Sequence, residues 1–386
     1  MTPSGLIALL LLIAAANGLL RIPFKRKERS ESRVFRRSLI RRVELKFVEP
    51  IYHEATIYVG EDRLKFTVQL DTGSSTLVLP SAKCDSCFGA AKFQCQKESN
   101  HTANVTYVLG EGFGRFCEDE VWFAGLKVAH QQMLLFEEKD KILQSYDTDG
   151  VVGLRFTSDA LSVRFLSEVY PFVPVKVTYA PTPLIKNIQM QGLVERTAFA
   201  FHFTKDGGEF TLGGSDRTHY VGNLAYADII PFQTLWSVRL DGFHIGSTNA
   251  GNCDNEHCSA VIDSGSSFIW APDSLQNTIF LTLHSMVPGL INVHFRQRNR
   301  IGVRFYVLGN QVRFLQPLHI TIAGRNFTLQ PEDYISPSNI NGRKDLYRVE
   351  IVLYPIKSWT LGMTFMRKVF TEFDVDKRRI GFAPSN

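Results

Sequence analysis

The feature that most constrains this sequence is a motif that occurs twice. Residues 68–80 read VQLDTGSSTLVLP and residues 260–272 read AVIDSGSSFIWAP. Each copy is an apolar, strand-like run that breaks into Asp-Thr/Ser-Gly-Ser-Ser and then turns apolar again. Gly73 and Gly265 predict sharp turns where no side chain obstructs the backbone. Corresponding positions of the copies are 192 residues apart, about one domain length, which predicts two similar lobes that meet about a pseudo-twofold axis.

Such an arrangement brings Asp71 against Asp263. Two carboxyl groups in contact do not readily ionise together, so they share one proton and their apparent pKa values separate. The ionised member can take a proton from a water molecule, while the protonated member hydrogen bonds the carbonyl group under attack. This pair of roles suits the hydrolysis of an amide by water without a covalent intermediate.

With these motifs the chain resembles a divergent member of the pepsin-like aspartic proteases (peptidase family A1), and the resemblance covers nearly everything after residue 20. It implies an all-β, bilobal fold with a central cleft between two pseudo-twofold-related β lobes. It also implies that Asp71 and Asp263 are the catalytic pair. No metal and no organic cofactor is implied, because the ten histidines show no ligand spacing.

The residues beside each aspartate match the family's supporting positions. Thr72 and Ser264 correspond to residues whose hydroxyl groups tie the two loops together. Ser74 and Ser266 correspond to residues that hydrogen bond the outer carboxylate oxygens. Residues 149–154 and 359–362 resemble the segments that support the two loops.

A hairpin that covers the cleft is predicted downstream of the first motif. Val105-Thr106-Tyr107, followed by glycines that begin at Gly110, resembles the family's flap, with Tyr107 and Gly110 in contact with substrate. The alternative for Tyr107 is an ordinary half-buried strand tyrosine. Val78 stands where the family commonly has a Trp that hydrogen bonds this tyrosine; Val108 and Met363 are further departures.

The cysteines predict disulfides and an oxidising compartment. Six cysteines allow 15 pairings; they are Cys84, Cys87, Cys95, Cys117, Cys253 and Cys258. The last two are isolated, so we expect them to close a short loop while the other four pair among themselves. Cys84-x-x-Cys87 could indicate zinc, but no matching Cys/His pair follows. Possible glycan acceptors are Asn100, Asn104 and Asn326.

The amino terminus predicts export. Residues 6–16 form an apolar run of 11 residues, which is too short to span a bilayer. Small residues follow, so we interpret residues 1–18 as a signal peptide rather than a membrane anchor. The expected destination is the extracellular space or the lysosomal/endosomal lumen.

A basic segment follows the signal. Residues 19–47 hold eleven Lys/Arg and three acidic residues, a net charge of +8, whereas residues 48–386 carry −3. The segment could bind nucleic acid or membrane, remain solvated, or dock on the acidic body as a propeptide; export makes nucleic acid improbable. We favour the propeptide, because residues 21–25 resemble the start of the family's prosegment.

The predicted organisation is a signal peptide (1–18), a basic propeptide (19–47), an N-terminal lobe with Asp71 and the flap (48–203) and a C-terminal lobe with Asp263 (204–386). The predicted function is that of a monomeric aspartic endopeptidase, made as a secreted zymogen, that cleaves peptides or proteins at acid pH and is inhibited by its own propeptide. The alternative is a catalytically weak or inactive relative that binds a peptide or protein in the cleft. The intact aspartates and glycines favour the enzyme.

Overall fold

The structure is a computed structural model that describes residues 20–28, 51–87, 90–107, 110–141, 143–145, 148–156, 181–204, 207–231, 233–251, 253, 258–297, 300–338 and 340–386, with the backbone alone for 20–28. The predicted signal peptide, propeptide residues 29–47 and Val108 lie outside the described residues. Among the described residues, no helix has the length and apolar character needed to cross a bilayer.

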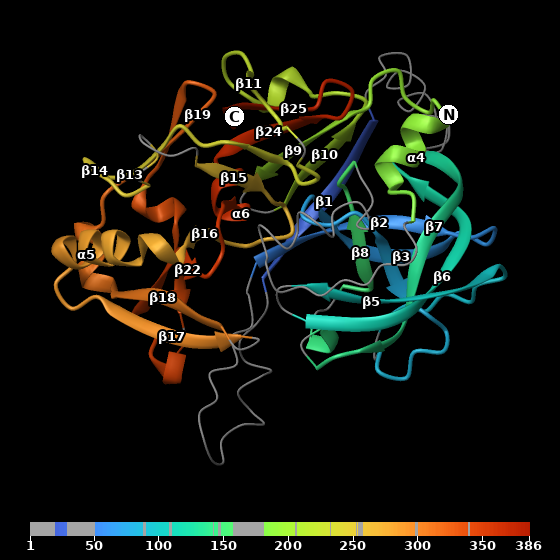
Figure 1. The fold of residues 1–386 in the computed structure, drawn as a ribbon, viewed down its shortest axis with the longest axis horizontal. Helices are drawn as coiled ribbons and strands as arrows, with labels where there is room; N and C mark the ends of the chain where they lie inside the picture. The colour runs from blue at the N-terminus through green and yellow to red at the C-terminus, as the bar shows by residue number, and fades with distance from the viewer. Residues whose placement is uncertain are drawn as a thin grey trace, which may run out of the picture.

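The strands of the N-terminal half form one lobe, drawn in blue to green in Figure 1. They are β2 (Ile51–Val59), β3 (Leu64–Asp71), β4 (Leu77–Pro80), β5 (Glu98–Tyr107), β6 (Gly110–Phe123), β7 (Leu126–Lys139) and β8 (Gly150–Gly153). β3 pairs in parallel with β8, and β4 packs between β8 and β7. Helix α4 (Leu184–Met190) contacts β7.

The C-terminal half forms the second lobe, drawn in yellow to orange. Its strands are β12 (Ser237–Arg239), β13 (Gly242–Ile245), β14 (Thr248–Asn249), β15 (Ser259–Ile262), β16 (Ile269–Pro272), β17 (Ile291–Gln297), β18 (Arg300–Leu308), β19 (Leu318–Ile322), β20 (Arg325–Leu329), β21 (Ile335–Ser338), β22 (Leu346–Tyr354) and β23 (Trp359–Leu361). The main sheet has the order β12-β15-β23-β16-β22-β18-β17, with β21 on β22. Helices α5 (Gln276–Met286) and α6 (Met363–Met366) belong to this half.

A shared sheet joins the lobes across the upper part of Figure 1. Its strands run in the order β11-β25-β24-β9-β10-β1 and continue through β2 into the first lobe. They are β1 (Leu20–Glu28), β9 (Ala198–Thr204), β10 (Gly207–Leu212), β11 (Ala225–Asp228), β24 (Val369–Asp374) and β25 (Arg379–Pro384). The predicted lobe boundary at residues 203/204 falls at the end of β9, inside this sheet.

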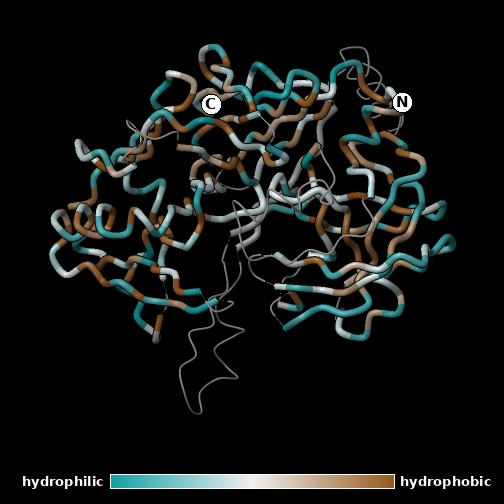
Figure 2. Tube along the Cα trace, in the orientation of Figure 1, coloured by the Kyte–Doolittle hydropathy of each residue, from teal (hydrophilic) through white to brown (hydrophobic). Residues whose placement is uncertain are grey.

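Aromatic residues hold the shared sheet together. Phe199 and Phe201 are two residues apart on β9, so the period of two of a strand places their rings on the same face, while Ala200 between them is buried on the other face. Phe199 stacks on Phe373 at 4.9 Å and contacts Trp236 edge to face at 5.7 Å. The same alternation appears in Figure 2, where brown and teal segments follow each other along many strands. The predicted all-β, bilobal fold is confirmed.

The cysteines form three disulfides in the described structure: Cys84–Cys87, Cys95–Cys117 and Cys253–Cys258. The last closes the short loop that the isolation of these two cysteines predicts. The other four pair among themselves, and the adjacent Cys84 and Cys87 bond to each other instead of holding zinc.

Candidate active site

In both copies of the doubled motif, the aspartate lies at the end of a strand that pairs with a parallel strand. That neighbouring strand ends at a glycine in the first lobe and directly before a glycine in the second. β3 ends at Asp71, which pairs in register with Gly153 of β8. The second copy follows β15, whose last residue, Ile262, pairs with Leu361 of β23. A Cβ atom on Gly153 would overlap the backbone of Ser75, so this position requires glycine.

Gly362 plays the matching part in the second lobe. A Cβ atom there would overlap the carbonyl oxygens of Ser266 and Phe268. The main chain of the second loop is also joined to the residue before this glycine, because Asp263 N donates to Leu361 O at 3.1 Å. Residues 149–154 and 359–362 therefore support the two loops, as the resemblance implied.

Two hydroxyl groups tie the loops together in a symmetric exchange. Thr72 N donates to Ser264 Oγ at 3.0 Å, and Ser264 N donates to Thr72 Oγ1 at 2.9 Å. Each hydroxyl then donates to a carbonyl of the opposite lobe, Thr72 to Ile262 O (2.9 Å) and Ser264 to Leu70 O (2.8 Å). Both side chains are buried, so these bonds are protected from water.

This exchange sets the two carboxyl groups against each other. A Cβ atom on Gly73 would lie 2.7 Å from Asp263 Oδ1, and one on Gly265 would overlap the carboxyl group of Asp71. Each glycine thus lies against the aspartate of the opposite loop. Gly73 N donates to Asp71 Oδ1 at 2.7 Å, and Gly265 N donates to Asp263 Oδ1 at 2.9 Å.

The electrostatics of the pair are unequal. Burial raises the pKa of Asp263 well above its usual range, and the charge of Asp71 together with a hydrogen bond to Asp71 raises this pKa further. The Gly265 N–H and the charge of Arg155 act in the opposite direction. These influences together favour the protonated form of Asp263.

Ser74 and Ser266 differ from each other, although the resemblance gives them the same role. Ser74 Oγ donates to Asp71 Oδ2 at 2.5 Å, as expected. Ser266 Oγ instead accepts a hydrogen bond from Trp270 Nε1 at 2.7 Å. Among the described residues, no hydrogen bond from Ser266 to Asp263 accompanies this contact.

The predicted flap is the β5–β6 hairpin, in which Tyr107 pairs in register with Gly110. Tyr107 is half-buried and packs, with Val105 and Leu143, on a cluster of the first lobe made of Val78, Cys84, Cys87, Phe116, Leu134 and Phe136. Burial raises the pKa of Tyr107, and the nearby charge of Asp71 raises it further. The tyrosine thus lies within reach of the charge of Asp71, and the cluster on which it packs includes Val78, which stands where the family commonly has Trp.

Two residues of the site were missed by sequence reasoning. Arg155 is 2% exposed, and its charge acts on Asp263; an arginine directly after the Gly153-Leu154 segment was the available signal. Trp270 was overlooked although it occupies the position in the second motif that Val78 occupies in the first.

The remaining predicted site residues lie on the surface. Asn100 and Asn104 on β5 and Asn326 on β20 are exposed, so a glycan could be attached without displacing core residues. Their modification stays a prediction.

One group of described residues has the composition of a metal site. Ligand atoms of Glu209 on β10 and of Asp216 and His219 in the 3-10 helix η2 (Arg217–His219) with its N-cap lie within 4.8 Å of one another. His219 Nε2 lies 3.5 Å from Glu209 Oε1, and Asp216 Oδ1 accepts hydrogen bonds from Thr218 N and Oγ1. These contacts form an ion pair and a cap, and we assign no ion to the group.

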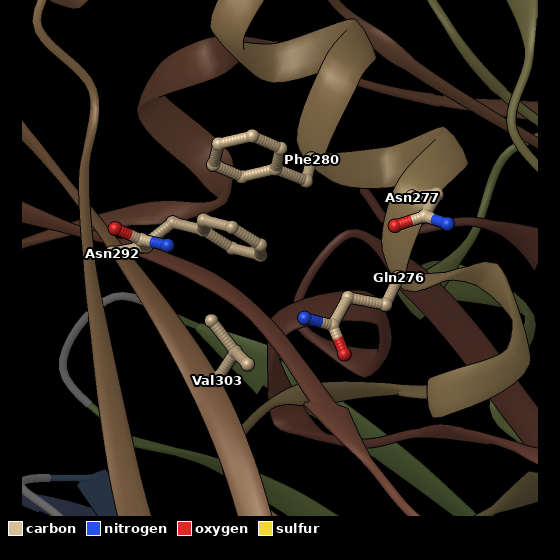
Figure 3. A pocket seen from close by; sticks show the side chains of 6 residues that line it. Gln276, Asn277, Phe280, Asn292 and Val303 are labelled. Carbon is tan, nitrogen blue, oxygen red and sulfur yellow. The ribbon is translucent and has the colours of Figure 1, made fainter.

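A pocket outside the site lies between α5 and the β17–β18 hairpin (Figure 3). Its lining residues are Gln276, Asn277, Phe280, Asn292, Val303 and Phe305. Carboxamide and apolar groups line it, so it offers hydrolysis neither an acid nor a base.

Comparison with known proteins agrees with this geometry. The family model described as "Eukaryotic aspartyl protease" matches residues 52–385. The chain is 29% identical to Renin-2 of Mus musculus over 345 residues, which cover 85% of this chain and 78% of the relative. It is 27% identical to Pepsin B of Canis lupus familiaris (87% and 82% covered) and 28% identical to Cathepsin D of Dictyostelium discoideum (87% and 84% covered).

Proposed function

The chain belongs to the eukaryotic aspartyl protease family, and we propose that it is itself an active aspartic endopeptidase with Asp71 and Asp263 as its catalytic pair. The observation that carries the proposal is the meeting of these two carboxyl groups from opposite lobes, each against the glycine of the other loop. The family as a whole supports peptide-bond hydrolysis; activity of this divergent member is our inference.

The unequal surroundings of the pair assign the roles. Asp263, whose pKa is raised, keeps the shared proton and donates it in a hydrogen bond to the scissile carbonyl. Asp71, whose carboxylate accepts hydrogen bonds from Gly73 N and Ser74 Oγ, acts as the base that removes a proton from the attacking water. As the tetrahedral intermediate forms, Asp263 gives its proton to the carbonyl oxygen and Asp71 receives a proton from the water molecule. The pair as a whole therefore still holds one proton.

The substrate is an extended peptide that lies across the dyad beneath the β5–β6 hairpin. Strand edges recognise extended peptides through main-chain hydrogen bonds, while pockets select side chains. The cluster beneath Tyr107 is apolar, with Val78, Phe116, Leu134 and Phe136 as members. We therefore propose that a hydrophobic side chain next to the scissile bond is favoured.

The basic segment supports synthesis as a zymogen. Its residues 20–28 form β1, which lies between β10 and β2 in the shared sheet. Lys25 stands opposite Glu54 in register, and Pro23 stands opposite Glu209. A basic strand held beside acidic residues of the body is stable while those carboxylates are ionised, and it loosens as the pH falls and they become protonated.

We further propose that the protein enters the secretory pathway. The predicted signal peptide and the three disulfides support an oxidising compartment.

The test is digestion of a mixed peptide library by the full chain after acid treatment, with and without pepstatin. We expect acid-dependent, pepstatin-sensitive cleavage that is lost in Asp71→Asn and in Asp263→Asn. Asp62→Asn is the matched control, because Asp62 is exposed in the turn between β2 and β3 and belongs to neither motif. Peptide binding without cleavage by the wild-type chain would instead establish the inactive binder and overturn the proposal.

A further inference from the structure

The two copies of the motif differ in one large side chain. Seven residues after the aspartate, the first copy has Val78 on β4 and the second has Trp270 on β16. Both side chains are buried, at 0% and 7% exposure. The molecule therefore contains two nearly identical loops, one with and one without an indole N–H at this point.

The difference coincides with a change in the serine of each loop. Beside Val78, Ser74 Oγ donates to Asp71 Oδ2. Beside Trp270, Ser266 Oγ accepts from the indole, and among the described residues no hydroxyl group donates to Asp263. In both loops, the backbone N–H of the glycine donates to the aspartate of its own loop. The serine is thus the part of the loop that responds to the indole.

Trp270 is held in place by its own neighbours. It contacts Tyr354 edge to face at 5.6 Å and lies 6.4 Å from Phe268. Tyr354 in turn stacks on Phe295 of β17, at 6.1 Å. Because these rings hold the indole in place, the hydrogen bond from Nε1 fixes the orientation of the Ser266 side chain.

We infer that Trp270 is a positioning residue that holds the Ser266 hydroxyl away from Asp263, keeps the shared proton on Asp263, and so extends hydrolysis to less acidic pH. The inference rests on the proposed function of the dyad. A hydrogen bond donated to an ionised carboxylate stabilises the ionised form, and its absence favours the protonated form. Only one carboxylate of the pair receives such a bond from a serine, which gives the shared proton a preferred position.

Other charged groups also act on Asp263. Asp71 faces it from the end of β3, Arg155 approaches from the segment after β8, and Tyr107 lies beside Asp71 on the flap. Asp71 favours the protonated form of Asp263 and Arg155 opposes it. A change confined to Trp270 leaves all three in place, so its effect can be measured against a constant background.

The test is the pH dependence of kcat/KM for Trp270→Phe. This change keeps an aromatic ring in the cluster and removes the N–H that fixes the orientation of the Ser266 side chain, so that the hydroxyl group can rotate toward Asp263 and donate to it. We expect the alkaline limb of the profile to move to lower pH by about one unit, the size expected of one hydrogen bond to a charged group. The matched control is Trp122→Phe, which also removes an indole N–H, but one that lies on β6, belongs to neither motif and donates to Glu120 at 3.4 Å.

Ser266→Ala distinguishes this mechanism from a general loosening of the loop. Without the hydroxyl group, the limb should stay at or above its wild-type position, and Trp270→Phe should cause no further shift in that background. A downward shift that persists in the double variant would overturn the inference. So would an equal shift in Trp122→Phe, or no shift in Trp270→Phe.

A second readout separates this inference from the proposed function. Infrared titration of the protonated carboxyl band, as the difference between the chain with and without Asp263→Asn, reports the protonation of Asp263 without any substrate. A lower titration midpoint in Trp270→Phe supports the inference even if the wild-type chain cleaves nothing, in which case only the proposed function fails. An unchanged midpoint overturns the inference whether or not the chain is active.

Discussion

The paired hydroxyl groups at the base of the site predict the effect of Thr72→Val. Thr72 Oγ1 accepts from Ser264 N and donates to Ile262 O, both at 2.9 Å, and the side chain is 0% exposed. Valine has nearly the same shape but leaves one buried N–H and one buried C=O unpaired. At about 1–3 kcal/mol for each orphaned group, the free energy of unfolding should fall by about 3 kcal/mol.

Thr371→Val is the matched control. Thr371 on β24 is also 0% exposed, but its Oγ1 has no hydrogen-bond partner among the described residues. Removing an unpartnered buried hydroxyl group leaves nothing newly unsatisfied, so this variant should be unchanged or slightly more stable. Thr→Val at equal burial should therefore destabilise the protein at position 72, where the hydroxyl group is hydrogen bonded, and should not destabilise it at position 371, where the hydroxyl group has no such bond among the described residues.

The assay is equilibrium urea denaturation at neutral pH, followed by kcat for peptide cleavage at acid pH. Thr72→Val should lose stability, and its kcat should fall by about tenfold or more because the dyad is no longer held in register. Ser264→Ala should behave similarly, since Ser264 makes the mirror-image bonds to Thr72 N and Leu70 O. Equal stability losses in Thr72→Val and Thr371→Val would refute the reasoning.

Two further predictions concern charge. In Arg155→Met the alkaline limb of the pH profile should move to higher pH, opposite to Trp270→Phe, because the charge of Arg155 lowers the pKa of Asp263; a downward or absent shift in kcat/KM against pH would contradict this. Arg196→Met should lower the neutral-pH free energy of unfolding by about 2 kcal/mol, a value reduced for the exposure of Arg196 and for the remaining partner Arg379. Burial raises the pKa of Asp374, but the hydrogen bond and charge of Arg196 outweigh it and lower this pKa. That stabilisation is present above the unfolded-state pKa and is lost as the pH falls through the lowered folded-state pKa, so the melting temperatures of the two chains should converge below the folded-state pKa.

Much of the site followed from short-range patterns. Each Asp-Thr/Ser-Gly turn after an apolar run identified Asp71 and Asp263, and the alternation of apolar residues identified the strands that carry them. The hydroxyl exchange between Thr72 and Ser264 followed from the resemblance and has the expected geometry. The pairing of Cys253 with Cys258 followed from their isolation, whereas the pairing of the other four cysteines remained open in the sequence.

The sequence by itself determined that two acidic turns exist and that the chain is β-rich, because glycine-dependent turns and period-two strands are set by neighbouring residues. Only the tertiary structure decided how the two turns differ. Three features depend on which side chains meet after the sheets assemble: the donor that holds Ser266, the approach of Arg155 to Asp263, and the packing of Tyr107 on the cluster that includes Val78. The orientation of one hydroxyl group between two possible partners is fixed by distances of a few tenths of an ångström, and no local pattern in a sequence encodes these.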